Sequence, residues 1–201
     1  MLPRPGAKGA DEVPERVDPK TELTAGDHFR LTVEVPASGF LYVIDREKYK
    51  DGTESAPYLI YPNWQTRSGD NVVAPGRLIE IPDRREQVNT FELKPDRADE
   101  VAEVLSLLVS PEPLSGLKIG DQPLKLEESV YAAWEKKWGV QAEQFELVGG
   151  PGQAWTDKEK LAGGDHAATM TQDDALPQTL YRVNVKPGNA VLVQVPLKIK
   201  Q

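Results

Sequence analysis

Apolar and polar residues alternate with a period of two along several short segments of the chain. In LTVEV, residues 31–35, the apolar positions share one side and the polar positions the other, which predicts a strand with one solvent-facing side. GFLYVIDR, residues 39–46, and VAEVLSLLVS, residues 101–110, are apolar on both sides. Such runs are typical of strands covered on both faces, so we predict that these two lie in the centre of a sheet.

The last part of the chain shows the clearest alternation. LYRVNV, residues 180–185, and residues 191–199 are separated by the turn sequence KPGN, which predicts that the sheet is completed by a final hairpin. Pro196 has no backbone N–H to donate to a neighbouring strand. We therefore expect the end of the last strand to lie at a sheet edge.

Residues 56–82 combine aromatic residues with strand stops and turns. YLIYP predicts a short strand that ends at Pro62, and Pro75-Gly76 occupies the central positions of a predicted type II turn between two short strands. Proline supplies the required φ at the first of these positions, and glycine tolerates the positive φ at the second. TFELK, residues 90–94, alternates again and predicts a further strand.

Helical periodicity is found mainly in residues 125–139. Trp134 and Trp138 recur at a four-residue step, which predicts that both dock the helix onto the sheet, and Gly139 is a predicted helix stop. TDKEKLA, residues 156–162, predicts a second, shorter helix with the spacing of a capping box. Residues 111–178 are therefore interpreted as a helix-and-loop insertion.

Short strands separated by Gly/Pro turns, without helices alternating between them, favour an antiparallel arrangement over a βαβ array. We predict a mainly-β, immunoglobulin-like antiparallel β-sandwich formed by residues 20–201, with the insertion at about 111–178. Residues 1–19 contain almost no apolar side chains and are predicted to be a linker or tail.

Charge and composition narrow the classes of partner. The chain of 201 residues has a formal net charge of −8, which disfavours binding to a phosphate backbone, so nucleic acid is not an expected partner. No apolar run has the ~20 residues that a membrane helix needs. The absence of cysteine excludes thiol catalysis and cysteine-ligated zinc. A chain of this length can bury a full core without a metal or a disulfide.

An ordered series of turn and core residues resembles the bacterial domain-of-unknown-function family numbered forty-three eighty-four. The series covers roughly residues 25–115 and comprises Gly39, residues 41–46, Asp51-Gly52, residues 60–63, Asn71, Gly76 and Ile81-Pro82. This sequence departs from the family pattern at Tyr61, where phenylalanine is usual, and in a longer charged loop at residues 46–57. The resemblance implies an accessory module of bacterial envelope or signalling proteins, and it implies no catalytic residue.

Aromatic residues in polar contexts are the candidate binding residues. Trp64 and Trp155 lie in predicted loops, where an exposed indole can stack on a protein, a proline-rich peptide or a sugar. Asn63 adjoins Trp64, and either Tyr58 or Tyr61 is expected to face outward, because the two lie on opposite sides of one predicted strand. Covering a gap at the end of the sandwich is the slightly favoured role for both tryptophans.

The second candidate site is the segment around one of the two histidines, His166. Asp165 could orient its ring, and Asp173 and Asp174 could add oxygen ligands for a cation. The residue spacing is unlike an EF-hand loop, and a solvated acidic loop is the simpler interpretation. His28 is interpreted as a residue at the start of a strand.

These patterns lead to one main functional hypothesis and two alternatives. The main hypothesis is a non-enzymatic, extracytoplasmic interaction module of a bacterial envelope or secreted protein, with another protein as partner and no cofactor. The first alternative is a hydrolase or metal-dependent enzyme with its site around His166. The second is a carbohydrate-binding module that uses the loop residues Trp64 and Trp155, with a glycan as the ligand.

Overall fold

The computed structural model describes residues 2–3, 14–15, 20–83, 86–140, 143–146, 179–182 and 188–200. Four of these segments are short strands described by their backbone alone. β1 (Leu2–Pro3) and β2 (Pro14–Glu15) form one antiparallel pair, and β12 (Glu143–Glu146) and β13 (Thr179–Arg182) form another. The first pair lies in the segment predicted to be a linker or tail.

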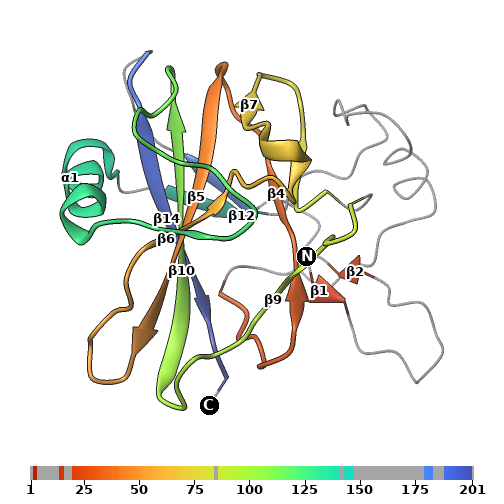
Figure 1. The fold of residues 1–201 in the computed structure, drawn as a ribbon. Helices are drawn as coiled ribbons and strands as arrows, with labels where there is room; N and C mark the ends of the chain where they lie inside the picture. Colours follow the sequence, from red (N-terminus) through yellow and green to blue (C-terminus); the bar gives the residue numbers. More distant parts are fainter. Residues whose placement is uncertain are drawn as a thin grey trace.

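Two long strands, β5 (Gly39–Tyr49) and β10 (Glu100–Ser110), occupy the centre of the six-stranded main sheet. The order across the sheet is β11 (Leu124–Lys125), β6 (Tyr58–Tyr61), β5, β10 and β14 (Val191–Lys198), and β7 (Val72–Val73) pairs with the first residues of β5. All of these pairings are antiparallel. In Figure 1, β5, β10 and β14 are the tall orange, green and blue arrows. The prediction of two central strands is confirmed.

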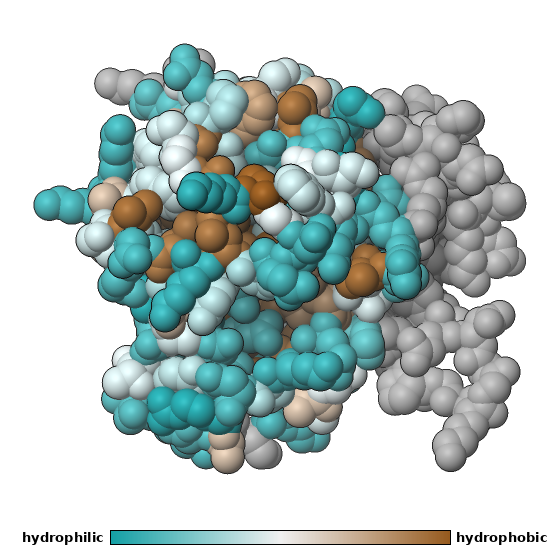
Figure 2. All heavy atoms as spheres, viewed as in Figure 1, coloured by the Kyte–Doolittle hydropathy of each residue, from teal (hydrophilic) through white to brown (hydrophobic). Residues whose placement is uncertain are grey.

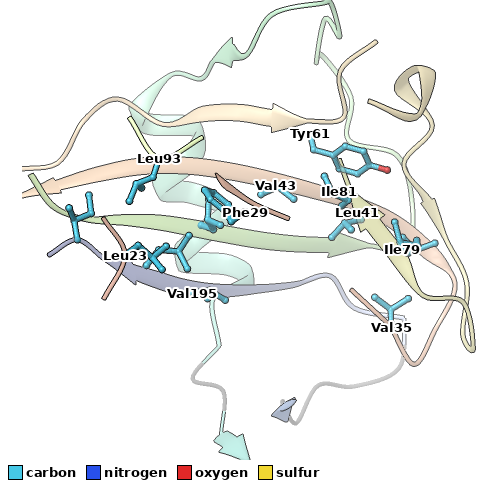
Figure 3. Packing of buried hydrophobic residues seen from close by; sticks show 14 residues of the cluster. Leu23, Phe29, Val35, Leu41, Val43, Tyr61, Ile79, Ile81, Leu93 and Val195 are labelled. Atoms are coloured by element: carbon cyan, nitrogen blue, oxygen red, sulfur yellow. The ribbon is translucent and has the colours of Figure 1, made fainter. Parts of the chain in front are cut away.

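A second layer covers one face of the main sheet. It consists of β3 (His28–Phe29) paired with β9 (Phe91–Glu92) and of β4 (Leu31–Val33) paired with β8 (Ile79–Ile81). Figure 3 shows Leu23 and Leu93 toward one end of the core between the layers, and Tyr61 and Ile79 toward the other. This arrangement confirms an antiparallel β-sandwich, while its immunoglobulin-like strand arrangement stays a prediction.

The helix α1 (Glu128–Trp138) covers the opposite face of the main sheet (Figure 1). Its Tyr131 is 1% exposed and packs with Tyr42, Ile44 and other apolar residues of that face. Trp134 and Trp138 are partly buried against the same core, as predicted, with their ring centroids 6.2 Å apart. The helical part of the predicted insertion is therefore confirmed, whereas the helix predicted at 156–162 lies outside the described residues.

Leu59 and Tyr61 of β6 point to opposite faces of the sheet, although residues two positions apart in a regular strand share a face. Ile44 pairs with Leu59 whereas Val43 pairs with Tyr61, so one extra residue of β6 lies between these two pairs. Leu59 accordingly belongs to the core beneath α1, and Tyr61 belongs to the core between the two layers. This extra residue is a β-bulge, which re-aims the side chains that follow it.

The predicted final hairpin is wrong. Instead of pairing with the strand that precedes it, β14 pairs with eight successive residues of β10, and β13 pairs with β12. The other edge of β14 receives backbone hydrogen bonds near its ends, from Val140 N–H to Leu192 O and from Leu23 N–H to Lys198 O. Pro196 lies between these two points and has no N–H to donate. The expected edge position of the last strand is confirmed.

Three local details refine the predicted elements. The strand predicted to end at residue 46 continues to Tyr49, so part of the predicted charged loop belongs to the sheet. Gly76 has the positive φ expected of its turn, but β7 and β8 on either side pair with different strands. Gly139 ends α1 without a positive φ; a Cβ there would lie 2.3 Å from Glu135 O, so space requires the glycine.

Candidate functional site

The candidate recognition region is the loop that follows β6. Its Trp64 is 60% exposed, more than any other large hydrophobic residue in the described part of the chain. The Trp64 N–H donates to Gly120 O at 2.9 Å, which ties this loop to the segment between β10 and α1. A Cβ on Gly69 would lie 3.1 Å from Trp64 Cδ1, so the indole lies directly against the backbone of Gly69. The tryptophan is therefore exposed yet held in place.

Side chains within the loop fix its backbone. The Asn63 side chain donates to Ile60 O at 2.6 Å and accepts from Thr66 N–H at 2.9 Å. An asparagine that bonds its neighbouring backbone in this way stabilises a turn. Asn63 is half-buried, and both ends of its amide are used within the loop. Asn63, which adjoins Trp64, therefore stabilises the loop and does not offer its amide to a ligand.

Tyr61 connects the same loop to the core. Its ring is completely buried, and its hydroxyl donates to Asp70 O at 2.6 Å and accepts from Arg67 Nη1 at 3.3 Å. Burial raises the pKa of Tyr61 to about 12 against the opposing influence of Arg67, so the hydroxyl remains a donor at neutral pH. Arg67 also pairs with Asp70 at 3.1 Å. Tyr61 is thus the core-facing tyrosine of the predicted pair and is inaccessible to a ligand.

The exposed part of this loop is named the Trp64 surface, and it comprises Trp64, Arg67, Asp70 and Val72. Val72 is 52% exposed and follows the loop in β7, where its N–H donates to Asp70 Oδ1 at 3.0 Å. The 3-10 turn at 67–69 and β7 lie together at the upper end of the sandwich in Figure 1. The surface therefore combines apolar groups with one ion pair.

Apolar groups also gather beside this surface. Figure 2 shows brown residues among teal ones where α1 and the segment after β10 lie. Leu114, Leu117 and Ile119 of that segment are partly buried against the core beneath α1. Ile119 precedes Gly120, the acceptor for Trp64 N–H, so this apolar segment runs up to the Trp64 loop.

Two of the predicted binding residues do not join this surface. Tyr58 is half-buried at the opposite end of β6, paired with Asp45 and Lys125. Trp155 lies outside the described residues. The structure thus places Trp64 on the surface, Asn63 in the loop framework, Tyr61 in the core and Tyr58 apart from all three.

A second polar region was not predicted from the sequence. It lies on the face of the main sheet that carries Tyr61, at the opposite end. The acidic cluster comprises Asp45 and Glu47 of β5 and Glu100 and Glu103 of β10. Glu47 is directly opposite Glu103, and Glu100 is opposite Tyr49. Because alternate residues of a strand share a face, Asp45, Glu47 and Tyr49 point to one side. Glu100 and Glu103 are only 1% and 8% exposed.

Burial and mutual repulsion shift the protonation of this cluster. Burial is the main cause that raises the pKa of Asp45 and of Glu103 well above the ordinary carboxyl range, with neighbouring carboxylates adding to it. Burial also raises the pKa of Glu100 to about 7, partly offset by the Asp96 N–H, which donates to Glu100 Oε2 at 3.0 Å. Burial and the Asp96 carboxylate raise the pKa of Tyr49, whose hydroxyl donates to Asp96 Oδ1 at 3.0 Å.

The sequence contains a partial signal for this cluster. Asp45 and Glu47 are two positions apart, with one residue between them, and Glu100 and Glu103 open the next central strand. The sequence pattern predicts a strand that ends at residue 46 and a loop at residues 46–57, which leaves Glu47 off the strand face. The cross-strand pairing of Glu47 with Glu103 also depends on register, which a single sequence does not define.

The remaining candidate positions offer little chemistry in the described part of the chain. His28 Nδ1 is 3.0 Å from Thr90 Oγ1, in keeping with a strand-start role. Asp165, His166, Asp173 and Asp174 lie outside the described residues. Between α1 and β14 is a cleft of about 220 Å³ whose polar lining groups, Glu135 and Gln194, bond each other at 2.8 Å. Ligand pockets usually have volumes of about 300–1,000 Å³.

The described part of the chain contains neither a metal-binding group of side chains nor a membrane-spanning helix. In that part of the chain, no group of three or more histidine, cysteine, aspartate or glutamate side chains is arranged to hold a metal ion. Likewise, none of the described helices combines the length and apolar character needed to cross a membrane.

Comparison with known proteins adds no relative. No protein-family model matches the chain, and neither the curated proteins nor the solved structures include a match to it. The Trp64 surface and the acidic cluster are therefore the features of the molecule that point to a function.

Proposed function

We propose that this chain is a non-enzymatic protein-interaction module whose partner docks on the Trp64 surface. The main observation that supports this proposal is that Trp64 is 60% exposed on a loop held to the core by hydrogen bonds. Tryptophan is enriched among the residues that dominate protein–protein binding energy. An indole that is already held in position loses little conformational entropy on binding, which favours affinity.

The surroundings of Trp64 favour a protein over a glycan. A sugar site pairs an aromatic ring with polar groups that are free to bond hydroxyls, but both ends of the Asn63 amide are engaged by Ile60 and Thr66. Arg67 and Asp70 are paired with each other. The exposed neighbour is the aliphatic Val72. An apolar centre with a charged rim is the usual composition of a protein interface.

The resemblance to family forty-three eighty-four supports the same proposal. That family consists of accessory modules, so membership would make this chain a binding or positioning part of a bacterial envelope or secreted protein. The proposed location is extracytoplasmic. The residues that carry the resemblance include Ile60 and Asn63, whose hydrogen bond holds the Trp64 loop in this structure, whereas Tyr61 stands where the family usually has phenylalanine. The family pattern would therefore preserve the support of the surface rather than a chemistry.

Site-specific cross-linking provides the first part of the test. A photoreactive amino acid replaces Trp64 in the full chain expressed in the source bacterium, and a matched control carries it at Val130, which is 39% exposed on α1. We expect one protein to be cross-linked from position 64 and not from position 130. Cross-linking of the same protein from both positions would contradict a docking site at Trp64.

Affinity measurement with the purified partner provides the second part. We expect Trp64→Ala to weaken binding by about 2 kcal/mol, roughly thirtyfold in Kd, and Val130→Ala to leave it unchanged. Calorimetry measures both variants against the unmodified chain. Equal affinity of the Trp64→Ala variant would refute the proposal, and binding to a glycan array that Trp64→Ala abolishes would replace it with the carbohydrate-binding alternative.

A further inference from the structure

The acidic cluster brings like charges together within the sheet. Glu47 and Glu103 are a directly opposed cross-strand pair, and Asp45 lies two residues from Glu47 on the same face. Side chains of directly opposed residues are about 4.5–5.5 Å apart at Cβ, and two like charges in such a pair destabilise the sheet. The register therefore makes full ionisation of Asp45, Glu47 and Glu103 unfavourable in the folded protein.

One carboxyl oxygen of the cluster is buried without a hydrogen bond, although the Arg46 backbone N–H also bonds the Asp45 carboxylate. Asp45 Oδ1 has less than 1 Å² of exposed surface and accepts no hydrogen bond. A buried ionised oxygen without a donor is strongly unfavourable. A protonated carboxyl, by contrast, is itself a donor, and it can bond to a neighbouring carboxylate. When one carboxylate of the cluster binds a proton, the cluster loses one negative charge and gains an O–H group that can donate a hydrogen bond.

The basic side chains of the two central strands do not neutralise this cluster. Arg46 and Lys48 alternate with the acidic residues of β5 and so point to the opposite face. There Arg46 pairs with Glu54 at 3.3 Å and Glu128 at 3.0 Å. Arg97 lies over the Tyr49 ring, 3.9 Å from its centroid, and pairs with Asp99 at 2.7 Å.

The layer that covers this end contributes charges of both signs. Leu23 and Leu93 belong to the core at this end, and the charged residues of the segments that contain them are Lys20, Glu22, Asp27, His28, Arg30, Glu92 and Lys94. Asp27 accepts the Thr24 N–H at 2.7 Å, and Lys94 pairs with Glu92 at 2.8 Å. On β14, the neighbour directly opposite Glu103 is the apolar Leu197. The charged groups that act most strongly on Glu103 are Asp45, Glu100 and Glu47, all of them acidic.

We propose that Asp45 and Glu103 share a proton in the folded protein, beside the like charge of Glu47, and that loss of this proton as the pH rises loosens this end of the sandwich. This proton-binding site is separate from the Trp64 surface. The raised pKa values of Asp45 and Glu103 support it, as burial and neighbouring carboxylates favour the protonated form. A carboxyl with a raised folded-state pKa stabilises fully below its unfolded pKa, and this stability is lost as the pH rises through the folded value.

The linkage predicts an unusual pH profile for the whole chain. Unfolded carboxyls titrate near pH 4, whereas burial raises the pKa of Asp45 to about 7 and that of Glu103 higher, so this proton is retained into the neutral range. From about pH 5 to pH 8 the folding equilibrium constant should therefore fall about tenfold per pH unit for each retained proton. Urea unfolding of the full chain at several pH values measures this slope.

Glu103→Gln is the decisive variant, because it keeps the shape of the side chain and replaces the proton-binding group. We expect this variant to lose the share of one proton, about tenfold per pH unit, while the share of Glu100 remains and Glu34→Gln at an exposed position keeps the whole slope. The difference between the unmodified chain and Glu103→Gln cancels the contribution of the histidines. If Glu103→Gln does not fold, Asp45→Asn provides the same comparison.

A direct count of protons distinguishes this proton-binding site from other causes. Unfolding of the unmodified chain at pH 7 in weak buffer should release a proton to an indicator dye, and unfolding of Glu103→Gln should release less. Equal release and equal slopes in both chains would overturn the proposal. Stabilisation by Ca²⁺ at pH 8 that Glu103→Gln abolishes would also overturn it, because a cation would then take the place assigned to the proton.

Discussion

Two buried tyrosines at opposite ends of one sheet face show how differently a hydroxyl can be used. The Tyr61 hydroxyl donates to a neutral backbone carbonyl, Asp70 O, at 2.6 Å and accepts from Arg67. The Tyr49 hydroxyl donates to the Asp96 carboxylate at 3.0 Å and lies next to Glu47 at 3.4 Å. Tyr61 thereby fixes the loop that presents Trp64, whereas Tyr49 borders the acidic cluster.

The difference lies in what surrounds each hydroxyl. Around Tyr61 every polar group named in the loop has a complementary partner, so the region is held rigidly and carries one exposed indole. Around Tyr49 acidic side chains face one another across two strands. Complementary pairing favours a fixed surface, while like charges make stability depend on protonation. The same sheet face can thus hold a rigid region and a pH-dependent one.

Tyr61→Ala is expected to have the largest effect on either region. Removal of a completely buried aromatic ring leaves a cavity and should reduce the free energy of unfolding by about 3–5 kcal/mol. The Trp64 loop would lose its anchor as well, so partner binding should weaken. Urea denaturation followed by fluorescence measures the stability.

Tyr61→Phe is the matched control for this prediction, because it removes the hydroxyl and keeps the ring. Its expected cost is about 1 kcal/mol, the usual net value of one hydrogen bond. A cost equal to that of Tyr61→Ala would show that the hydroxyl bonds, rather than the packing of the ring, hold this end of the sandwich together.

Tyr49→Phe should have a smaller effect at the other end. The Asp96 side chain is exposed, so water can replace the lost donor, and we expect a cost of about 1 kcal/mol at neutral pH. The pH slope of stability should be unchanged, because Glu47 and Glu103 remain opposed. A slope that disappears in this variant would assign the linkage to Tyr49 and Asp96 instead of to the acidic cluster.

The sheet core could be predicted from the sequence because its apolar residues alternate or run continuously. β5 and β10 combine apolar positions on both faces, and the structure covers both faces. Trp134 and Trp138 were assigned correctly because their helical spacing identifies one side of α1. The spacing of apolar residues is enough to predict an element wherever each side of that element lies in a uniform environment.

Pairing partners could not be predicted in the same way. The sequence KPGN suggested a local hairpin, yet β14 pairs with β10, which precedes it by about 80 residues and gains eight paired positions. The β-bulge in β6 is also invisible in the alternating pattern, although it decides that Leu59 and Tyr61 face opposite cores. Long-range register determined the acidic cluster too, so Glu103 was missed even though each strand was found.

Trp64→Ala should change the free energy of unfolding least of these variants. This variant therefore distinguishes the Trp64 surface from the acidic cluster most clearly. The indole is 60% exposed and contacts Gly69 within its own loop, so its removal opens no cavity in the core. We expect the free energy of unfolding to fall by about 0.5 kcal/mol, with an unchanged pH slope, which urea denaturation at pH 5 and pH 8 would measure. Val130→Ala is the control for loss of an exposed apolar side chain. A loss of several kcal/mol would make Trp64 a structural cover rather than a contact residue, because a side chain that serves recognition can be removed without unfolding its support.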